Sequence, residues 1–336
     1  MKIFAILLCV SIAPVLAAID GTVVNRTTGK PQAGATVSLY KLGQSGMEAM
    51  ESVKSGADGK FTITQDAQGP RLLQTAFDGV VYNQMLPPGS STSGIAVAVY
   101  NSSRQPGSAK VAQHIVFFEP SGSQMSVNEI YAFQNDGNTT WNDPESGTLQ
   151  FYLPAAAKGI VRVDCTAPNG MPVRRAADKT ARPDIYKVDF PIKPGETRID
   201  LSYVLPYAAD TTFEGKLLYK GGPTRLVAPR GVTLKGDAIT ALGEEPRTQA
   251  EVYEVKSNEF KISIAGSGTL RRGGDSEGED SGSSFEQIMP RVWQKMPWIL
   301  AIAIGILGAG FLLLYRASEQ PAMPAPVKGK DGRRRR

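Results

Sequence analysis

The residue types that most often carry enzymatic chemistry are scarce in this chain of 336 residues. It has one histidine, His114, and two cysteines, Cys9 and Cys165. A single imidazole cannot build a zinc site with two histidine ligands, and any hydrolase triad would have to use His114 itself. The sequence also has no phosphate-binding loop and no dinucleotide fingerprint. We therefore predict a protein that is not an enzyme and that uses no cofactor, with His114 as an ordinary strand residue.

The first residues have the layout of a secretory signal peptide. MKIFAILLCVSIAPVLAA contains a lysine, an apolar run from Ile3 to Leu16, and the small residues Ala17 and Ala18. Segments of this kind direct export and are removed next to small residues. We expect residues 1–18 to be cleaved and the chain that follows to be exported.

Cysteine is too scarce for an intramolecular disulfide in the exported chain. Removal of the signal peptide leaves Cys165 alone, although the compartment is oxidising. Within GIVRVDCTA, Val161, Val163 and Cys165 alternate with Arg162 and Asp164, which is the pattern of a half-buried strand. We expect this thiol to be buried and inert.

A second apolar run, WILAIAIGILGAGFLLLY, covers residues 298–315 without a charge. As a helix it would be about 27 Å long, close to the thickness of a bilayer's hydrocarbon core. Trp293 and Trp298 at one end, and Tyr315 and Arg316 at the other, are residue types that favour the membrane interface. A buried core helix is the alternative, but too little chain follows to bury it. We predict one membrane span.

Net positive charge is confined to the tail, residues 316–336. The whole chain has a formal charge of +5, and the tail alone contains seven basic and two acidic residues, which is the same excess. Lys and Arg accumulate on the cytoplasmic side of a span and attract anionic lipid headgroups. We predict a cytoplasmic tail that contacts membrane lipid and binds no nucleic acid, with the preceding domains extracytoplasmic in a single-pass cell-membrane protein.

The span also carries small residues at a spacing of four. Ala301, Gly305 and Ala309 would lie along one face of the helix. Small residues on one face allow two membrane helices to approach closely. The spacing makes a homodimer through the span possible, although small residues are also common in spans generally.

Helical periodicity is almost absent between the signal and the span. Runs such as KFTIT, HIVFFE and FKISIA alternate apolar and polar residues, and Pro-Gly and Asn-Gly pairs separate them. We predict an all-β region of two or three β-sandwich domains in tandem, plus one C-terminal transmembrane helix. The predicted segments are residues 19–101, 111–207 and 212–265, followed by a Gly-, Ser- and acid-rich stalk at 266–289.

The first segment resembles a known family. GTVVNRTTGKPQAGATVSLYK, followed by SGADGKFTI, is similar to the carboxypeptidase regulatory-like domain, a transthyretin-like sandwich with a carbohydrate-binding-like fold. Gly29 and Gly59 suit turns with positive φ, and alternating apolar residues suit a shared core. The matching positions are Gly21, Val23, Gly29, Pro31, Gly34, Ala35, Val37, Asp58, Gly59 and Phe61.

The resemblance implies a binding module rather than a peptidase. In zinc carboxypeptidases the module is a non-catalytic appendage, and the catalytic domain needs two histidines and a glutamate on zinc. This sequence departs from the family where Ser55 and Gly56 replace a common Thr-Asp pair. The remainder of the chain resembles no family.

One loop is rich in oxygen donors. QNDGNTTWNDPESG could supply ligands to calcium, but it lacks EF-hand spacing, and the same residue types form ordinary turns. A hairpin loop without metal is the favoured interpretation. The candidate ligands are Asp136, Asn138, Asn142, Asp143 and Glu145.

Carbohydrate binding is an alternative function, because sugar sites usually present exposed aromatic rings. Trp141 is the only tryptophan outside the membrane region, and Tyr131 or Tyr152 would have to complete a platform. Those tyrosines also suit core or strand-edge positions.

Together these patterns predict a non-catalytic, membrane-anchored protein for extracytoplasmic recognition, adhesion or scaffolding. Its expected partner is an envelope protein or a glycan. A membrane-tethered carbohydrate-binding module is the main alternative, and an unrecognised enzyme is the least favoured one.

Overall fold

The described part of the protein is most of the region that the sequence predicts to be exported. The predicted signal peptide, membrane span, cytoplasmic tail and most of the stalk lie outside it. By its contacts the chain divides into residues 1–275 and 276–336, and every described residue belongs to the first unit. Within the described residues, no helix is long and apolar enough to cross a membrane. The computed structural model describes residues 19–43, 46–65, 69–208, 211–219 and 221–270.

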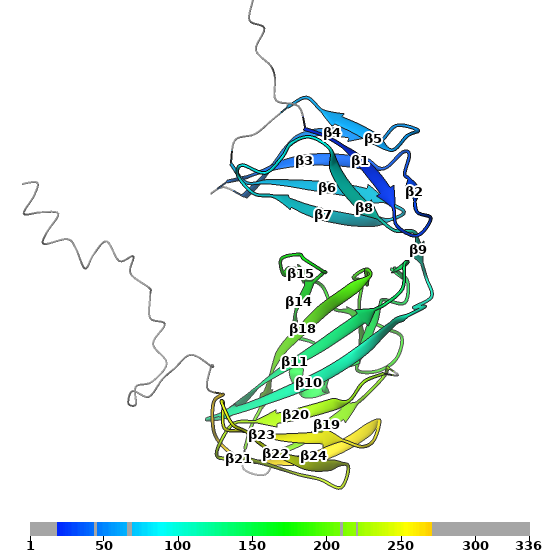
Figure 1. Cartoon of the computed structure of the whole chain (residues 1–336). Helices are drawn as coiled ribbons and strands as arrows, with labels where there is room; N and C mark the ends of the chain where they lie inside the picture. Colours follow the sequence, from blue (N-terminus) through cyan, green and yellow to red (C-terminus); the bar gives the residue numbers. More distant parts are fainter. Residues whose placement is uncertain (1–18, 44–45, 66–68, 209–210, 220, 271–336) are drawn as a thin grey trace, which may run out of the picture. The chain divides into compact units, whose positions relative to one another are not determined.

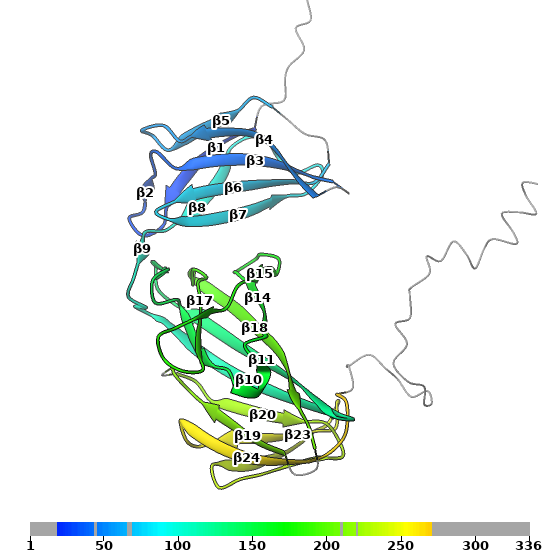
Figure 2. The same cartoon turned by 180° about the vertical axis from the view of Figure 1, so that it is seen from behind.

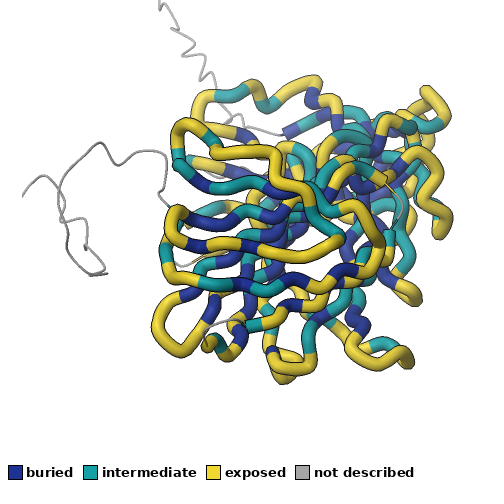
Figure 3. Tube along the Cα trace, turned by 90° about the horizontal axis from the view of Figure 1, so that it is seen from below, coloured by how far each residue is buried: buried dark blue, intermediate teal, exposed yellow. Residues whose placement is uncertain are grey.

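Strands and turns make up these residues, and the only helical element among them is the single 3₁₀ turn η1 (Ala155–Ala157). The prediction of an all-β protein is therefore confirmed. Buried and exposed residues alternate along the strands, as Figure 3 shows, so the period-2 patterns of the sequence do reflect strand faces.

Residues 19–101, here called the N-terminal body, form two four-stranded sheets around one core (Figure 1). In the first sheet β1 pairs with β5 antiparallel, with β8 parallel and with the short β2. The second sheet has the order β4-β3-β6-β7 and is antiparallel throughout. The strands are β1 (Ile19–Asn25), β2 (Lys30–Pro31), β3 (Thr36–Gly43), β4 (Gly46–Lys54), β5 (Lys60–Ile63), β6 (Arg71–Phe77), β7 (Val80–Leu86) and β8 (Ile95–Val99).

The core of the N-terminal body contains the side chains that alternation placed there. Val23, Val37, Leu39 and Ile63 are fully buried, and Phe61 is nearly so. Gly59 has a φ of 75°, and a Cβ at this position would lie 2.7 Å from the Val23 carbonyl oxygen. Only glycine fits both the backbone conformation and the space.

Residues 102–270, here called the C-terminal body, are built on an eight-stranded sheet of order β15-β14-β18-β11-β10-β20-β23-β22 (Figures 1 and 2). A two-residue turn at Gly122 and Ser123 joins its two long central strands, β10 and β11. The strands are β10 (Ala109–Ser121), β11 (Gln124–Asn135), β14 (Arg162–Thr166), β15 (Val173–Arg175), β18 (Gly195–Pro206), β20 (Thr224–Ala228), β22 (Ile239–Glu245) and β23 (Ala250–Val255).

Two three-stranded sheets, β13-β17-β16 and β19-β24-β21, share a single hydrophobic core with the large sheet. They cover one of its faces. On the other face, called here the open face, side chains are half-buried or exposed. The remaining strands are β9 (Ser102–Ser103), β12 (Thr140–Trp141), β13 (Leu149–Tyr152), β16 (Asp178–Lys179), β17 (Ile185–Val188), β19 (Thr211–Lys216), β21 (Val232–Lys235) and β24 (Glu259–Gly266).

The predicted division between segments 111–207 and 212–265 does not coincide with a division of this core. β10 from the first segment pairs in parallel with β20 from the second, and both segments contribute to the same cluster of buried side chains. A polar connection between strand runs resembles a linker in sequence. Alternation within a strand contains no information about its neighbour, so the shared sheet could not be read from the pattern.

Two glycines allow β20 to enter the sheet beside β10. A Cβ at Gly221 would lie 2.3 Å from the Val111 carbonyl oxygen, and one at Gly222 would lie 1.8 Å from the Ala112 carbonyl oxygen. The Gly222 N–H donates to the Val111 carbonyl at 2.7 Å. Any side chain here would push the two strands apart.

Candidate functional site

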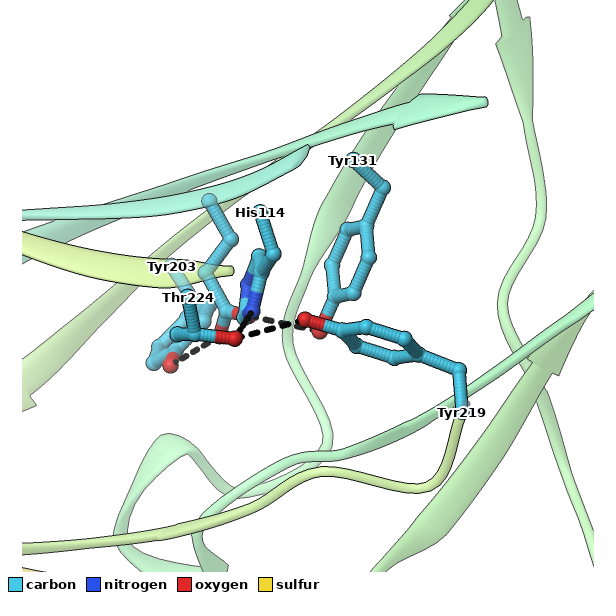
Figure 4. Close-up of polar contacts among 6 residues, drawn as sticks. His114, Tyr131, Tyr203, Tyr219 and Thr224 are labelled. Atoms are coloured by element: carbon cyan, nitrogen blue, oxygen red, sulfur yellow. Dashed lines mark hydrogen bonds and ion pairs between the residues drawn. The ribbon is translucent and has the colours of Figure 1, made fainter. Parts of the chain in front are cut away.

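A cluster of polar side chains lies in the core of the C-terminal body, between the large sheet and the residues that precede β20 (Figure 4). Its members come from β10, β11, β18, β20 and the approach to β20, and all but Tyr219 are buried. We call it the polar cluster. It contains His114, Glu129, Tyr131, Tyr203, Tyr219 and Thr224.

The Glu129 carboxylate is the centre of the polar cluster. One oxygen, Oε2, lies 2.9 Å from His114 Nε2 and accepts a 2.9 Å hydrogen bond from the Tyr131 hydroxyl. The other oxygen accepts a 2.6 Å bond from the Tyr203 hydroxyl. Burial opposes ionisation of this carboxyl, but the hydrogen bond and charge of His114 and the two tyrosine bonds outweigh burial. They hold the pKa of Glu129 below its usual value.

The other side of His114 connects the cluster to β20. His114 Nδ1 lies 3.4 Å from the Thr224 hydroxyl, which in turn lies 2.7 Å from the Tyr219 hydroxyl. The imidazole stacks on Tyr131, with ring centroids 4.0 Å apart, while Tyr219 meets it edge-on. Burial, followed by the Glu129 charge, raises the pKa of Tyr131 and Tyr203 well above the usual value, so both remain protonated donors.

This arrangement suits a structural role better than a catalytic one. His114 and Glu129 are at most 5% exposed, and protein side chains already bind both carboxylate oxygens. The cluster joins strands that are far apart in sequence by satisfied hydrogen bonds, which gives the core a specific alignment. His114 is a strand residue as predicted. Sequence reasoning missed Glu129, although its place between Val127 and Tyr131 on the buried side of a strand was a usable signal.

In the predicted calcium loop, the carboxylates do not come together at one site. Asp136 accepts a hydrogen bond from Gln134, Asp143 caps the backbone N–H of Ser146, and Glu145 pairs with Arg104 at 3.1 Å. Asn138 is exposed and Asn142 half-buried. Within the described ranges, no three His, Cys, Asp or Glu side chains are grouped to hold a metal ion.

The three aromatic residues considered for sugar binding do not present a set of exposed rings. Tyr131 is buried in the polar cluster. Trp141 is half-buried, packs against the core and donates its indole N–H to the Arg104 carbonyl. Tyr152 is half-buried, with the Lys216 ammonium 5.7 Å from its ring centroid.

Cys165 lies on the apolar face of β14 and is fully buried. Burial raises the pKa of its thiol to about 12, so the reactive thiolate is suppressed. The interface residues Trp293, Trp298, Tyr315 and Arg316, and the helix-packing residues Ala301, Gly305 and Ala309, lie outside the described residues.

An apolar patch lies on the outer face of the β4-β3-β6-β7 sheet in the N-terminal body. Tyr40 stands opposite Leu72, Leu72 stands opposite Met85, and Leu42 stands opposite Met47. Met47 is 55% exposed and Met85 is 41% exposed. We call these five residues the outer patch.

The neighbouring row of the same face is polar, and its side chains form hydrogen bonds with one another. The hydroxyls of Ser38 and Ser52 are 2.6 Å apart, and Gln74 donates to Asn83 at 3.2 Å. This polar row separates the outer patch from Val81, which is also 41% exposed, at the other end of the same face.

Comparison with known proteins identifies no family for this chain. No family model matches the chain, and no curated protein matches it. Among solved structures it is similar to an M1 zinc metallopeptidase from Deinococcus radiodurans, at 11% identity and a TM-score of 0.23. It is also similar to a mutant of that enzyme bound to a Tyr-Ser-Ala substrate, at 12% identity and a TM-score of 0.26.

Each match covers 46% of this chain and 42% of the other, so the chain spans less than half the length of these structures. TM-scores this low carry no argument for fold or activity.

Proposed function

We propose that this protein is a non-catalytic, single-pass membrane protein whose exported β domains bind a protein partner of the cell envelope. The outer patch is the observation that carries the proposal. It exposes two methionines beside Tyr40 and Leu42 on a sheet face, where a folded domain ordinarily places polar residues.

The chemistry of the outer patch favours a protein partner over a glycan. Methionine side chains are flexible and polarisable, so they adapt to apolar side chains of different shapes. A sugar would instead need an exposed aromatic platform with polar neighbours, which Trp141, Tyr131 and Tyr152 do not form. The burial of His114 within the polar cluster supports a protein without a catalytic site.

The proposal includes the architecture that the sequence predicts. A carboxypeptidase regulatory-like sandwich at 19–101 and the C-terminal body would lie outside the membrane. The span at 298–315 would anchor them, and the tail would contact lipid. Protease added to intact spheroplasts should digest the exported domains and leave an epitope in the tail protected. Digestion of the tail in sealed cells would contradict this topology.

Site-specific photo-cross-linking tests the outer patch directly. A photoreactive phenylalanine analogue at Met85, in the full chain in its own membrane, should give a discrete adduct with one envelope protein. The same analogue at Asn83, on the same strand and face but in the polar row, is the matched control. Met85→Glu should abolish co-purification of the adduct partner, and Asn83→Glu should not. Equal adducts from both positions would refute a patch-specific contact.

A further inference from the structure

We propose that the open face of the eight-stranded sheet is a second binding site, which takes an extended polypeptide segment with large apolar side chains and a carboxylate at one end. The site lies in the C-terminal body and does not depend on the outer patch. With two separate protein-binding surfaces, the chain would act as a scaffold between two partners.

Two adjoining hollows form a groove on the open face. The first, of about 470 Å³, has a floor of Ile115, Phe117, Val227 and Val252 on β10, β20 and β23. The second, of about 320 Å³, extends over β11 and β18 beside Ile130. Phe117 lines both hollows. From β18 to β23 the groove crosses five neighbouring strands, a length of about 19 Å at roughly 4.8 Å per strand, and Glu245 on β22 lies at its edge.

The dimensions of the groove suit a polypeptide. An extended segment of about six residues has this length. A segment of this chain already lies at one end: the Gly268 N–H donates to the Pro120 carbonyl at 3.1 Å, and the Leu270 N–H donates to Glu119 at 2.9 Å. Leu270 lines the second hollow. The open face thus accepts a polypeptide backbone and an apolar side chain.

Charge gives the occupant a direction. At the β20–β23 end of the groove stand Arg225, Arg247 and Glu245. The Glu245 carboxylate is already bound by the N–H and hydroxyl of Thr248, at 2.7 and 2.5 Å. The Arg225 side chain is exposed and makes no ion pair or hydrogen bond with any other described residue, although Arg225 stands opposite Glu254 on β23.

Among the described residues that line the opposite end of the groove, no cation is available. There Arg198 binds Asp200 through two contacts, at 2.7 and 2.9 Å. A carboxylate on the occupant would therefore bind at the end with Arg225, and its apolar side chains would lie on Ile115, Phe117 and Ile130.

A random heptapeptide library displayed on phage tests the site with the full-length protein held in lipid nanodiscs. Selection against the wild type, with the Phe117→Ser variant as the counter-target, should enrich peptides that carry an acidic residue and apolar residues at alternate positions. Arg225→Glu should lower the affinity for synthetic copies of these peptides by about tenfold or more, because close charge pairs across an interface couple strongly. Arg182→Glu, an exposed arginine of the same body outside both hollows, should leave their affinity unchanged.

Several outcomes would overturn the proposal. The first is a selection that returns no peptide able to distinguish the wild type from Phe117→Ser. Others are peptides dominated by lysine and arginine, and affinity that survives Arg225→Glu. Binding of laurate in place of any peptide would show an amphiphile site, and self-association lost in Phe117→Ser would show an interface between copies. Met85→Glu should bind the selected peptides normally, which separates failure of this site from failure of the outer patch.

Discussion

The N-terminal body and the C-terminal body pack their cores in different ways. The core of the N-terminal body is formed mainly by apolar side chains, and among the described residues it contains no buried carboxylate. Several of its strands pair with their neighbours in sequence, as β3 does with β4 and β6 with β7. The core of the C-terminal body holds a hydrogen-bonded carboxylate at its centre and joins strands about a hundred residues apart. Both bodies bury polar groups, among them Asn25, Arg71 and Thr75 in the first. Within the described residues, only the second core holds a buried carboxylate bound by three other side chains.

Removing the carboxylate should have the largest effect. Glu129→Ala leaves His114, Tyr131 and Tyr203 buried without their acceptor, and breaking a buried pair in this way costs about 3–5 kcal/mol. Peptide-resolved hydrogen exchange on the full chain in nanodiscs should show lost protection in the C-terminal body and unchanged protection in the N-terminal body. Leu39→Ala should show the reverse. If either variant lost protection equally in both bodies, the two cores would not differ in the way argued above.

A methyl group at Gly222 tests the junction of β10 and β20. Its Cβ would meet the Ala112 carbonyl, and overpacking of this kind costs about 1–3 kcal/mol. Gly222→Ala should therefore lower the free energy of unfolding of the C-terminal body in a urea titration. Gly43→Ala is the matched control, because no atom of the described residues lies within 4 Å of a Cβ at that position. Equal stability of the two variants would show that the close approach is not required.

Acidification should also separate the bodies. The pKa of Glu129 in the folded protein is below its ordinary value of 4.5, so ionised Glu129 stabilises the fold above that pH. This contribution is lost as the pH falls through the folded pKa. Unfolding measured across the acid range should show a steeper loss of stability in the wild type than in Glu129→Gln.

An exposed carboxyl provides the control for the pH measurement. Hydrogen bonds from Gln65 and Thr64 also lower the pKa of Glu51 in the N-terminal body, but this carboxyl is in contact with solvent. Glu51→Gln should leave the acid profile nearly unchanged. A profile altered equally by both substitutions would assign the pH dependence to carboxyls in general.

The smallest effect is expected at the edge of the polar cluster. Tyr219 is half-buried and donates or accepts one hydrogen bond, with Thr224. Tyr219→Phe should cost about 0.5–1.5 kcal/mol, the net value of one hydrogen bond, in the same urea titration. A loss as large as that of Glu129→Ala would mean that Tyr219 is as central as the carboxylate.

Much of the local structure could be predicted from the sequence. Alternation identified the buried residues Val23, Val37 and Phe61, and it placed Cys165 on the apolar face of a strand. It could not identify the polar cluster, because the members of the cluster are distant in sequence: His114 and Thr224 are 110 residues apart. A polar residue such as Glu129 at a buried position shows that a partner is needed but does not show which one.

The sequence by itself determined the all-β class, the inward face of each strand and the glycine that the turn at Gly59 requires, since these follow from the geometry of short stretches of chain. Only the tertiary structure decided that β10 lies beside β20, that two predicted segments share one core, and that Glu129 meets three donors. The face of a strand depends on the period of its own residues, whereas the neighbour of a strand depends on competition among all strands of the chain for the same edge.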